Sequence, residues 1–353
     1  MISKEDPFPR KRIDVLDAFL ATIDLDQDAG NPVVFLHGNP THSYVWRNVI
    51  RHVRGLGRIV APDLIGMGAS GRPAIAYRFF DHARYLDAFL NALQLDQITF
   101  VAHDWGVALA LHWMTRNESR VLGIAMSEGV LAPTPTWEDF PPGGRATFQA
   151  FRTPGVGEAM ILDNNHFIEK SLPATILRSL APEELCAYRQ PFRKREDRLP
   201  MLVWPRELPI AGEPADVVSV VETSLRALCN SPIPKLLLTG DPGALVKRPL
   251  VEWCKLNIPS LEIASVGPSI HYPQEDQPEA FGTALAEWLK RSAQRTGLDS
   301  VPPLSRTPGS EGGGHHFLRG QKVPRNRGSS STQVRIGRFD GGSDGATAGW
   351  KLC

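Results

Sequence analysis

Short, largely apolar runs recur along the first half of the chain, and each ends abruptly in a polar or glycine-rich segment. The runs cover residues 33–36, 58–61, 98–102 and 121–126. Such runs are typical of strands that are buried on both faces, as in parallel sheets. Residues 13–23 alternate only weakly and predict one or two edge strands. Apolar residues recur at helical spacing between the runs, predicting helices at 44–53, 80–93 and 105–116, so the alternation indicates an α/β fold.

The pattern changes between Val130 and Ala211, where Pro, Trp and Phe are frequent. Short helices are predicted there at 145–151, 167–172, 174–180 and 182–188. This segment is interpreted as a helical cap inserted into the α/β domain. Alternation then resumes, with a helix at 217–228, strands at 235–239 and 261–266, and a last helix at 277–290.

These boundaries predict three parts of the chain. Residues 1–129 and 212–292 are assigned to the main domain, and residues 130–211 to the cap. From residue 293 to 353, Gly, Ser, Pro and Arg dominate and apolar periodicity ends. Such a composition buries too little apolar surface to order a chain, so this tail is predicted to be disordered.

One strand-to-helix junction carries the clearest candidate for chemistry. Residues 98–108 place Asp104 at the apex of the turn, with Ala102 two positions before it and Gly106 two positions after it. A sharp turn leaves no room for bulky side chains beside its apex, and small flanking residues are therefore typical of a nucleophile elbow. A carboxylate at that position suggests an alkyl-enzyme ester as the intermediate. The alternative is that Asp104 only caps the following helix.

Three further polar residues follow predicted strands, where α/β sheets place their chemistry. Asn39 follows strand 33–36, Glu128 follows strand 121–126, and His271 lies on the loop after the last strand. A carboxylate buried at such a place needs a partner, and a histidine is the natural one. Each residue also has an ordinary interpretation, as a turn residue, a solvent-facing loop residue or a structural histidine. The order of nucleophile, inserted cap and late histidine favours the α/β-hydrolase arrangement.

At four places the chain closely resembles the haloalkane dehalogenases. These are His37-Gly38-Asn39-Pro40-Thr41, His103-Asp104-Trp105-Gly106, Met126-Ser127-Glu128 and His271-Tyr272. The resemblance is to the subgroup whose catalytic acid follows the sixth strand. It runs from about Pro7 to Lys290 and includes cap segments at 147–153 and 207–214. It implies an α/β-hydrolase fold, with a mostly parallel eight-stranded sheet, flanking helices and an inserted helical cap.

The resemblance also implies roles for individual residues. Asp104 would be the nucleophile, His271 the general base and Glu128 the acid that orients His271. The side chains of Asn39 and Trp105 would bind the halide, and their backbone N–H groups would form the oxyanion hole. Residues of the cap and of the late loops are candidates to line the pocket, namely Phe148, Phe151, Phe167, Leu245 and Tyr272.

Two positions test whether the family's catalytic roles apply to this chain. In many α/β-hydrolases the catalytic acid follows the strand predicted here at 235–239, and that place falls on Gly243, which has no side chain. The vacancy supports Glu128 as the acid. Asp241 stands where the subgroup has Thr, and it could compete for His271, although a local turn role is preferred.

The residue types suit displacement of a halide from an sp³ carbon. An ionised carboxylate attacks in line, and neutral N–H donors stabilise the leaving halide without supplying a proton. Neutral His271 then takes a proton from water, which hydrolyses the ester. Neither a metal nor an organic cofactor is expected. The expected partners are a small apolar halogenated substrate, water and a halide ion, and the expected state is a monomer.

Other activities share parts of this pattern. Epoxide hydrolases also carry His-Asp-Trp-Gly, but they protonate an alkoxide with cap tyrosines and usually have an aromatic residue where Asn39 stands. The predicted cap has a single tyrosine, Tyr188, so dehalogenation is favoured. A coelenterazine luciferase related to the dehalogenases keeps a similar constellation. A non-catalytic binding protein on this scaffold would be expected to have lost the nucleophile or the base.

Composition narrows the partners further. The chain has 353 residues, is 42% hydrophobic and carries a formal net charge of +1. These values are ordinary for a globular protein, and they do not argue for binding to nucleic acid or to an anionic membrane. The N-terminus has no apolar leader, and the four cysteines are scattered without metal-ligand spacing. Reduced thiols and a cytoplasmic location are therefore expected.

Overall fold

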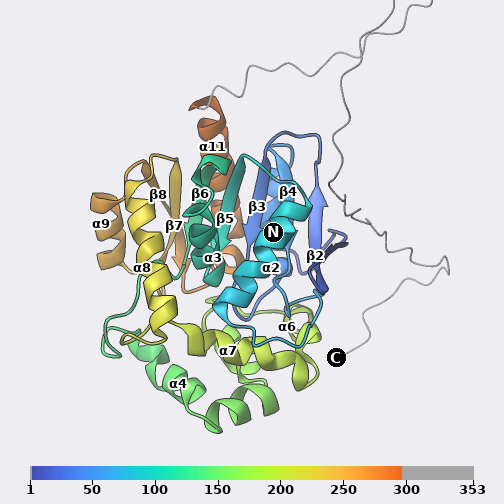
Figure 1. Cartoon of the computed structure of the whole chain (residues 1–353), viewed down its shortest axis with the longest axis vertical. Coiled ribbons are helices and arrows are strands. Elements are labelled where there is room, and N and C mark those ends of the chain that lie inside the picture. The colour runs from blue at the N-terminus through green and yellow to red at the C-terminus, as the bar shows by residue number, and fades with distance from the viewer. Residues whose placement is uncertain (1, 296–353) are drawn as a thin grey trace, which may run out of the picture.

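The computed structural model describes residues 2–295 and contains an eight-stranded sheet in the order β1-β2-β4-β3-β5-β6-β7-β8 (Figure 1). The strands are β1 (Lys11–Val15), β2 (Ala18–Leu25), β3 (Pro32–Leu36), β4 (Arg58–Pro62), β5 (Ile98–His103), β6 (Val121–Ser127), β7 (Lys235–Pro242) and β8 (Leu261–Ser269). β2 pairs antiparallel with β1 and β4, and every pairing from β4 to β8 is parallel. The predicted, mostly parallel sheet is confirmed.

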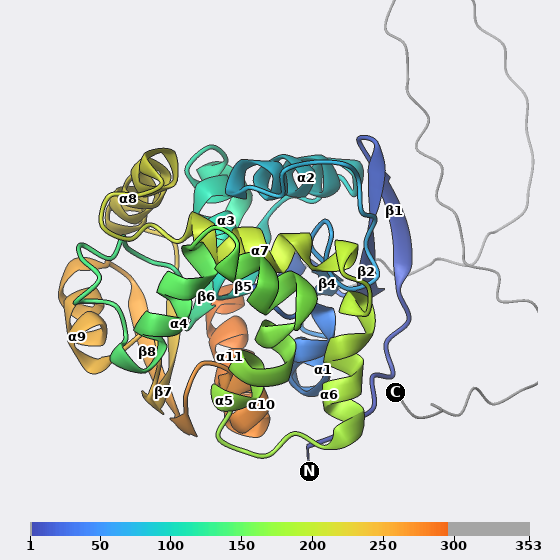
Figure 2. The ribbon, with the colours of Figure 1, turned by 90° about the horizontal axis from the view of Figure 1, so that it is seen from below.

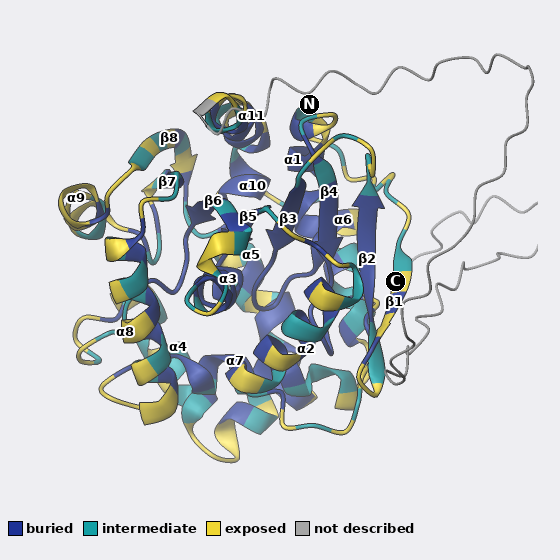
Figure 3. Ribbon diagram, turned by 45° about the horizontal axis from the view of Figure 1, so that its top comes forward, coloured by how far each residue is buried: buried dark blue, intermediate teal, exposed yellow. Residues whose placement is uncertain are grey.

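Helices cover both faces of this sheet, which explains why the central strands are apolar without alternation. On one face lie α2 (Phe79–Ala92), α3 (Trp105–Met114) and α8 (Ala215–Asn230), and on the other lie α1 (Arg47–Val53) and α11 (Pro278–Arg295) (Figure 2). Every residue of β3 and β5 is buried. Figure 3 shows the buried residues concentrated in the sheet and the exposed ones on the outer sides of the helices.

Short helices between β6 and α8 gather beyond the carboxyl ends of the parallel strands (Figure 1). They are α4 (Pro142–Arg152), α5 (Leu172–Ala174), α6 (Pro182–Arg189) and α7 (Leu199–Glu207), with π-helical turns at Glu158–Asp163 and Phe167–Ser171. The predicted helix at 174–180 is wrong, because α5 ends at Ala174. The backbone N–H groups of Leu177 and Arg178 donate to the carboxylate of Asp276 instead of to helical carbonyls. A helix after β7, α9 (Arg248–Asn257), was not predicted.

Two smaller expectations, on the tail and on the cysteines, have mixed outcomes. α11 continues to Arg295, so residues 293–295 are helical, and the rest of the predicted tail, 296–353, lies outside the described residues. Cys229 and Cys254 are free thiols as expected, but Cys186 is not. Among residues 2–295, no helix is long and apolar enough to cross a membrane.

Candidate active site

Asp104 occupies a sharp turn between β5 and α3. Its backbone has φ 54° and ψ −125°, a conformation that non-glycine residues rarely adopt outside functional sites. Its side chain makes no capping hydrogen bond to α3, so the capping interpretation is wrong. A Cβ atom at Gly106 would lie 2.3 Å from the backbone oxygen of Leu36. Only glycine therefore lets the turn sit this close to β3.

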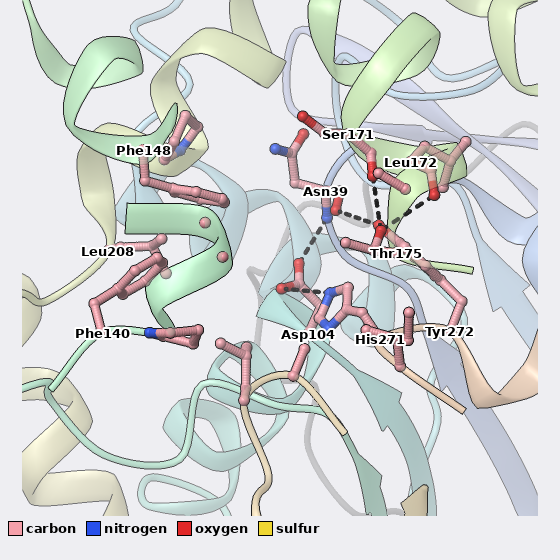
Figure 4. Close-up of a pocket in the computed structure, with 18 of the residues that line it drawn as sticks. Asn39, Asp104, Phe140, Phe148, Ser171, Leu172, Thr175, Leu208, His271 and Tyr272 are labelled. Atoms are coloured by element: carbon pink, nitrogen blue, oxygen red, sulfur yellow. Dashed lines mark hydrogen bonds and ion pairs between the residues drawn. The ribbon is translucent and has the colours of Figure 1, made fainter. Parts of the chain in front are cut away.

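His271 lies between two carboxylates. Its Nε2 is 3.5 Å from Oδ2 of Asp104, and its Nδ1 is 3.4 Å from Oε2 of Glu128. The three residues follow β5, β6 and β8, whose carboxyl ends meet at one edge of the sheet. Figure 4 shows the Asp104 carboxyl and the His271 ring facing one another beside the cavity. The structure therefore brings together the three residues that were predicted to form the catalytic triad.

Glu128 is completely buried, so it is not a solvent-facing loop residue. Its Oε2 accepts hydrogen bonds from the backbone N–H groups of Ala244 and Leu245, at 3.0 and 2.7 Å. A Cβ atom at Gly243 would lie 3.0 Å from Oε1 of Glu128. The carboxyl of Glu128 thus fills the space beside Gly243, the place where many α/β-hydrolases carry their acid.

Asp241 does not take part in this arrangement. It is exposed at the end of β7, beside the cis Asp241–Pro242 peptide bond. The His271 ring instead contacts Asp104 and Glu128. The preferred role of Asp241, in a local turn, is wrong, because Asp241 lies in β7 and pairs with Pro268 of β8.

The two carboxylates change how His271 titrates. Burial favours the neutral ring, but hydrogen bonds and negative charge from Asp104 and Glu128 outweigh it and raise the pKa of His271 to about 9. Burial likewise opposes ionisation of Asp104, yet contact with His271 keeps the pKa of that carboxyl below its usual value. Glu128 behaves in the same way, with its backbone donors adding to the effect. Asp104 is therefore an ionised carboxylate at neutral pH, as a nucleophile must be.

Asn39 and Trp105 approach Asp104 through their backbones and line its cavity with their side chains. The backbone N–H of Asn39 donates to Oδ1 of Asp104 at 2.8 Å, and the backbone N–H of Trp105 contributes to the lowered pKa of the same carboxyl. Behind the Trp105 ring, Trp204 of α7 is stacked with the ring centroids 4.6 Å apart. Asn39 is held from the other side, because its backbone oxygen accepts the Tyr272 hydroxyl at 3.2 Å.

A cavity of about 350 Å³ opens in front of Asp104. Of the predicted lining residues, Phe148, Phe167, Leu245 and Tyr272 do line it. Phe151 does not, because it is buried behind this wall with its ring 4.8 Å from that of Phe167. Other apolar lining residues were not noticed in the sequence, among them Phe140, Leu172, Pro205, Leu208 and Ile270. Figure 4 shows Phe140 and Phe148 across the cavity from Asp104 and His271.

Comparisons with known proteins identify relatives of this chain. Residues 31–248 match the family model described as alpha/beta hydrolase fold. A haloalkane dehalogenase from Mesorhizobium japonicum is 48% identical over 79% of this chain and 91% of its own length. One from Bradyrhizobium diazoefficiens is 44% identical over 86% of this chain and 99% of its own. The chain belongs to the haloalkane dehalogenases.

A solved structure extends the likeness to three dimensions. A haloalkane dehalogenase from Bradyrhizobium elkani is 46% identical, with a TM-score of 0.80, covering 82% of this chain and 99% of that one. The fold expected from the resemblance is therefore confirmed across most of the described residues.

One contact separates this haloalkane dehalogenase from the epoxide hydrolases. Tyr188, the single tyrosine of the predicted cap, is fully buried. Its hydroxyl donates to the carboxylate of Glu275, and it is not among the residues that line the cavity. The hydroxyl that an epoxide hydrolase would aim at an alkoxide is thus already committed elsewhere.

Proposed function

We propose that this protein hydrolyses small haloalkanes to an alcohol, a halide and a proton, with Asp104 as the nucleophile. The observation that carries the proposal is an ionised carboxylate at a strained elbow, facing an apolar cavity and contacting a histidine. An apolar cavity suits a substrate without charge, and it strengthens the electrostatic interactions inside it.

In the first step, Oδ2 or Oδ1 of Asp104 attacks the carbon that carries the halogen. A carbon–oxygen bond forms, and the carbon–halogen bond breaks with its electron pair leaving on the halide. The amide of Asn39 and the indole of Trp105 would donate to the halide as its negative charge grows, which stabilises the transition state more than the substrate. Stacking against Trp204 would keep the Trp105 indole in place.

The first step also prepares the second. Alkylation removes the negative charge of Asp104, which is one of the two groups that raise the pKa of His271. The effect of burial, which favours the neutral ring, is then opposed by the charge of Glu128 but no longer by that of Asp104, and the pKa of His271 falls. His271 is therefore neutral once the ester has formed, and it can accept a proton at the step that requires a base.

In the second step, His271 takes a proton from water, and the water oxygen bonds to the ester carbonyl carbon. The backbone N–H groups of Asn39 and Trp105 would stabilise the resulting oxyanion, and Glu128 would stabilise the imidazolium. Collapse breaks the bond between that carbon and the alkyl oxygen. The proton held by His271 goes to the departing alcohol, Asp104 is restored, and one proton is released overall.

We also propose that residues 130–211 act as the cap that shapes the substrate pocket. Phe140, Phe148, Phe167 and Leu208 come from this segment and form much of the apolar wall. The nucleophile, the base, the acid and the halide donors all belong to a single chain, so a monomer would suffice for catalysis.

The test is bromide release from 1-bromobutane or 1,2-dibromoethane by the purified protein. The matched variants are Asp104→Ala and His271→Phe. We expect the parent to release bromide over many turnovers and Asp104→Ala to release none. His271→Phe should release about one bromide per enzyme and then stop with an alkyl group on Asp104, which intact-mass spectrometry would detect. Turnover of styrene oxide without bromide release would favour an epoxide hydrolase instead.

A further inference from the structure

The loop that carries His271 is bound from two sides. The backbone N–H of His271 donates to the backbone oxygen of Thr175, at 3.0 Å. The backbone oxygen of His271 accepts a hydrogen bond from Nε2 of His103, at 2.7 Å. His103 belongs to β5, whereas Thr175 lies just after α5 in the predicted cap. The catalytic histidine is therefore anchored to the predicted cap as well as to the sheet.

Asp276 strengthens the anchor on the side of the predicted cap. Its Oδ1 accepts from the backbone N–H groups of Leu177 and Arg178, at 2.8 and 3.1 Å. Its Oδ2 is 3.4 Å from the backbone nitrogen of Ile270, the residue before His271. The Asp276 carboxylate thus joins residues 177–178 to both ends of the loop 270–276. It also occupies backbone N–H groups that a helix over residues 174–180 would use.

A buried charge cluster holds the same loop from behind. Glu275 is fully buried, and its carboxylate binds Arg47 of α1 at 2.5 Å and Arg178 at 2.5 Å. Glu184 of α6 contacts both arginines, at 2.7 and 2.6 Å, and Tyr188 donates its hydroxyl to Glu275. Each charge in the cluster has opposite charges as partners, so displacing one element would leave buried charges unpaired, which is strongly unfavourable.

We propose that residues 175–178 position His271 through Asp276, and that this anchor sets the rate of ester hydrolysis but not the rate of alkylation. The inference rests on the proposed function, because the proposed function separates alkylation by Asp104 from ester hydrolysis assisted by His271. Asp104 is fixed by the elbow between β5 and α3 and by the backbone N–H of Asn39. The loop 270–276 also reaches this group, because the Tyr272 hydroxyl donates to the backbone oxygen of Asn39, but the bonds of Asp276 itself go to Leu177, Arg178 and Ile270. His271 is needed in the second step, and its backbone is bound to Thr175 directly.

The test compares Asp276→Ala with Asp276→Asn and measures the two steps separately. Rapid-quench bromide release gives the alkylation rate, and steady-state alcohol formation with intact-mass spectrometry gives the hydrolysis rate. A misplacement of about 1 Å can cost roughly 100-fold, so Asp276→Ala should slow hydrolysis roughly 10- to 100-fold. Alkylation should change by less than about twofold, and alkyl-enzyme should accumulate. Asp276→Asn keeps an acceptor for the backbone N–H groups of Leu177 and Arg178 but not for that of Ile270, and it should restore part of the hydrolysis rate.

The matched control is Asp163→Ala, which removes a carboxylate of the predicted cap whose ion pair with Arg195 is exposed. It should leave both rates unchanged. Should Asp276→Ala fail to fold, Asp276→Glu gives the same test. It keeps the charge but moves the carboxylate by one methylene relative to the backbone N–H groups of Leu177, Arg178 and Ile270, and it should slow hydrolysis alone.

Equal slowing of both steps in a folded variant, or no slowing of either, would overturn the proposal. A parent protein that releases no bromide would instead contradict the proposed function. The two failures are distinguishable, because the variants are compared only with an active parent.

Discussion

Replacing Asp104 with Asn imitates the loss of charge that alkylation produces, without changing the shape of the side chain. The account predicts that the pKa of His271, about 9 in the parent, falls to its ordinary value or below. The amide oxygen of the new side chain would still accept the backbone N–H of Asn39, so the elbow itself should be preserved. The change isolates the charge of Asp104 from its position.

The magnitude follows from the geometry. A charge 3.5 Å from Nε2 of His271 contributes about 5 kcal/mol at an effective dielectric constant of about 20. Lowering the pKa from about 9 to the ordinary 6.5 requires about 3.4 kcal/mol. The charge of Asp104 is therefore sufficient, and burial of the ring acts in the same direction once that charge is gone.

NMR titration of the His271 ring would measure this pKa, with the resonance assigned by its absence in His271→Phe. Asp241→Asn is the matched control, since it removes an exposed carboxylate from a neighbouring strand end, and it should leave the pKa near that of the parent. A pKa that stays near 9 in Asp104→Asn would refute the reasoning that alkylation switches His271 into its basic form.

Three further outcomes are expected. Phe151→Ala should lower the free energy of unfolding by about 3–5 kcal/mol, because Phe151 is core rather than pocket wall, and chemical denaturation would show this; a loss below about 1 kcal/mol would contradict it. Gly243→Ala should reduce ester hydrolysis, since its Cβ would crowd Glu128 from a backbone with φ +66°, and unchanged turnover would count against that crowding. The raised pKa of His271 contributes stability that is fully present below pH 6.5 and is lost as the pH rises towards about 9. The difference in melting temperature between the parent and His271→Phe should therefore shrink over that range, and a difference that grows would contradict the sign.

The elbow could be predicted from the sequence because its signature is local. A buried strand, an acidic apex and small residues on either side are close together in the chain, and steric crowding at the turn explains the small residues. The same holds for the apolar strands at the centre of the sheet. The triad needed more, because the contact between Glu128 and the loop at Ala244 joins distant segments. The role of Glu128 was suggested by the resemblance to the haloalkane dehalogenases and by the lack of a side chain at Gly243.

The predicted cap was harder for a physical reason. Residues 174–180 have helical spacing, but the carboxylate of Asp276 takes the backbone N–H groups that a helix would use. Phe148 and Phe151 lie three positions apart on α4, yet only Phe148 reaches the cavity. Which face of such a helix meets the substrate depends on how the short helices pack against one another, and periodicity does not contain that information.

The most direct test of the covalent route is one turnover of a haloalkane in H₂¹⁸O with enzyme in excess. The account predicts that the alcohol carries ¹⁶O, because its oxygen comes from Asp104, and that the peptide containing Asp104 gains ¹⁸O. An alcohol labelled with ¹⁸O in that first turnover, with Asp104 unlabelled, would show direct attack by water and would contradict the account.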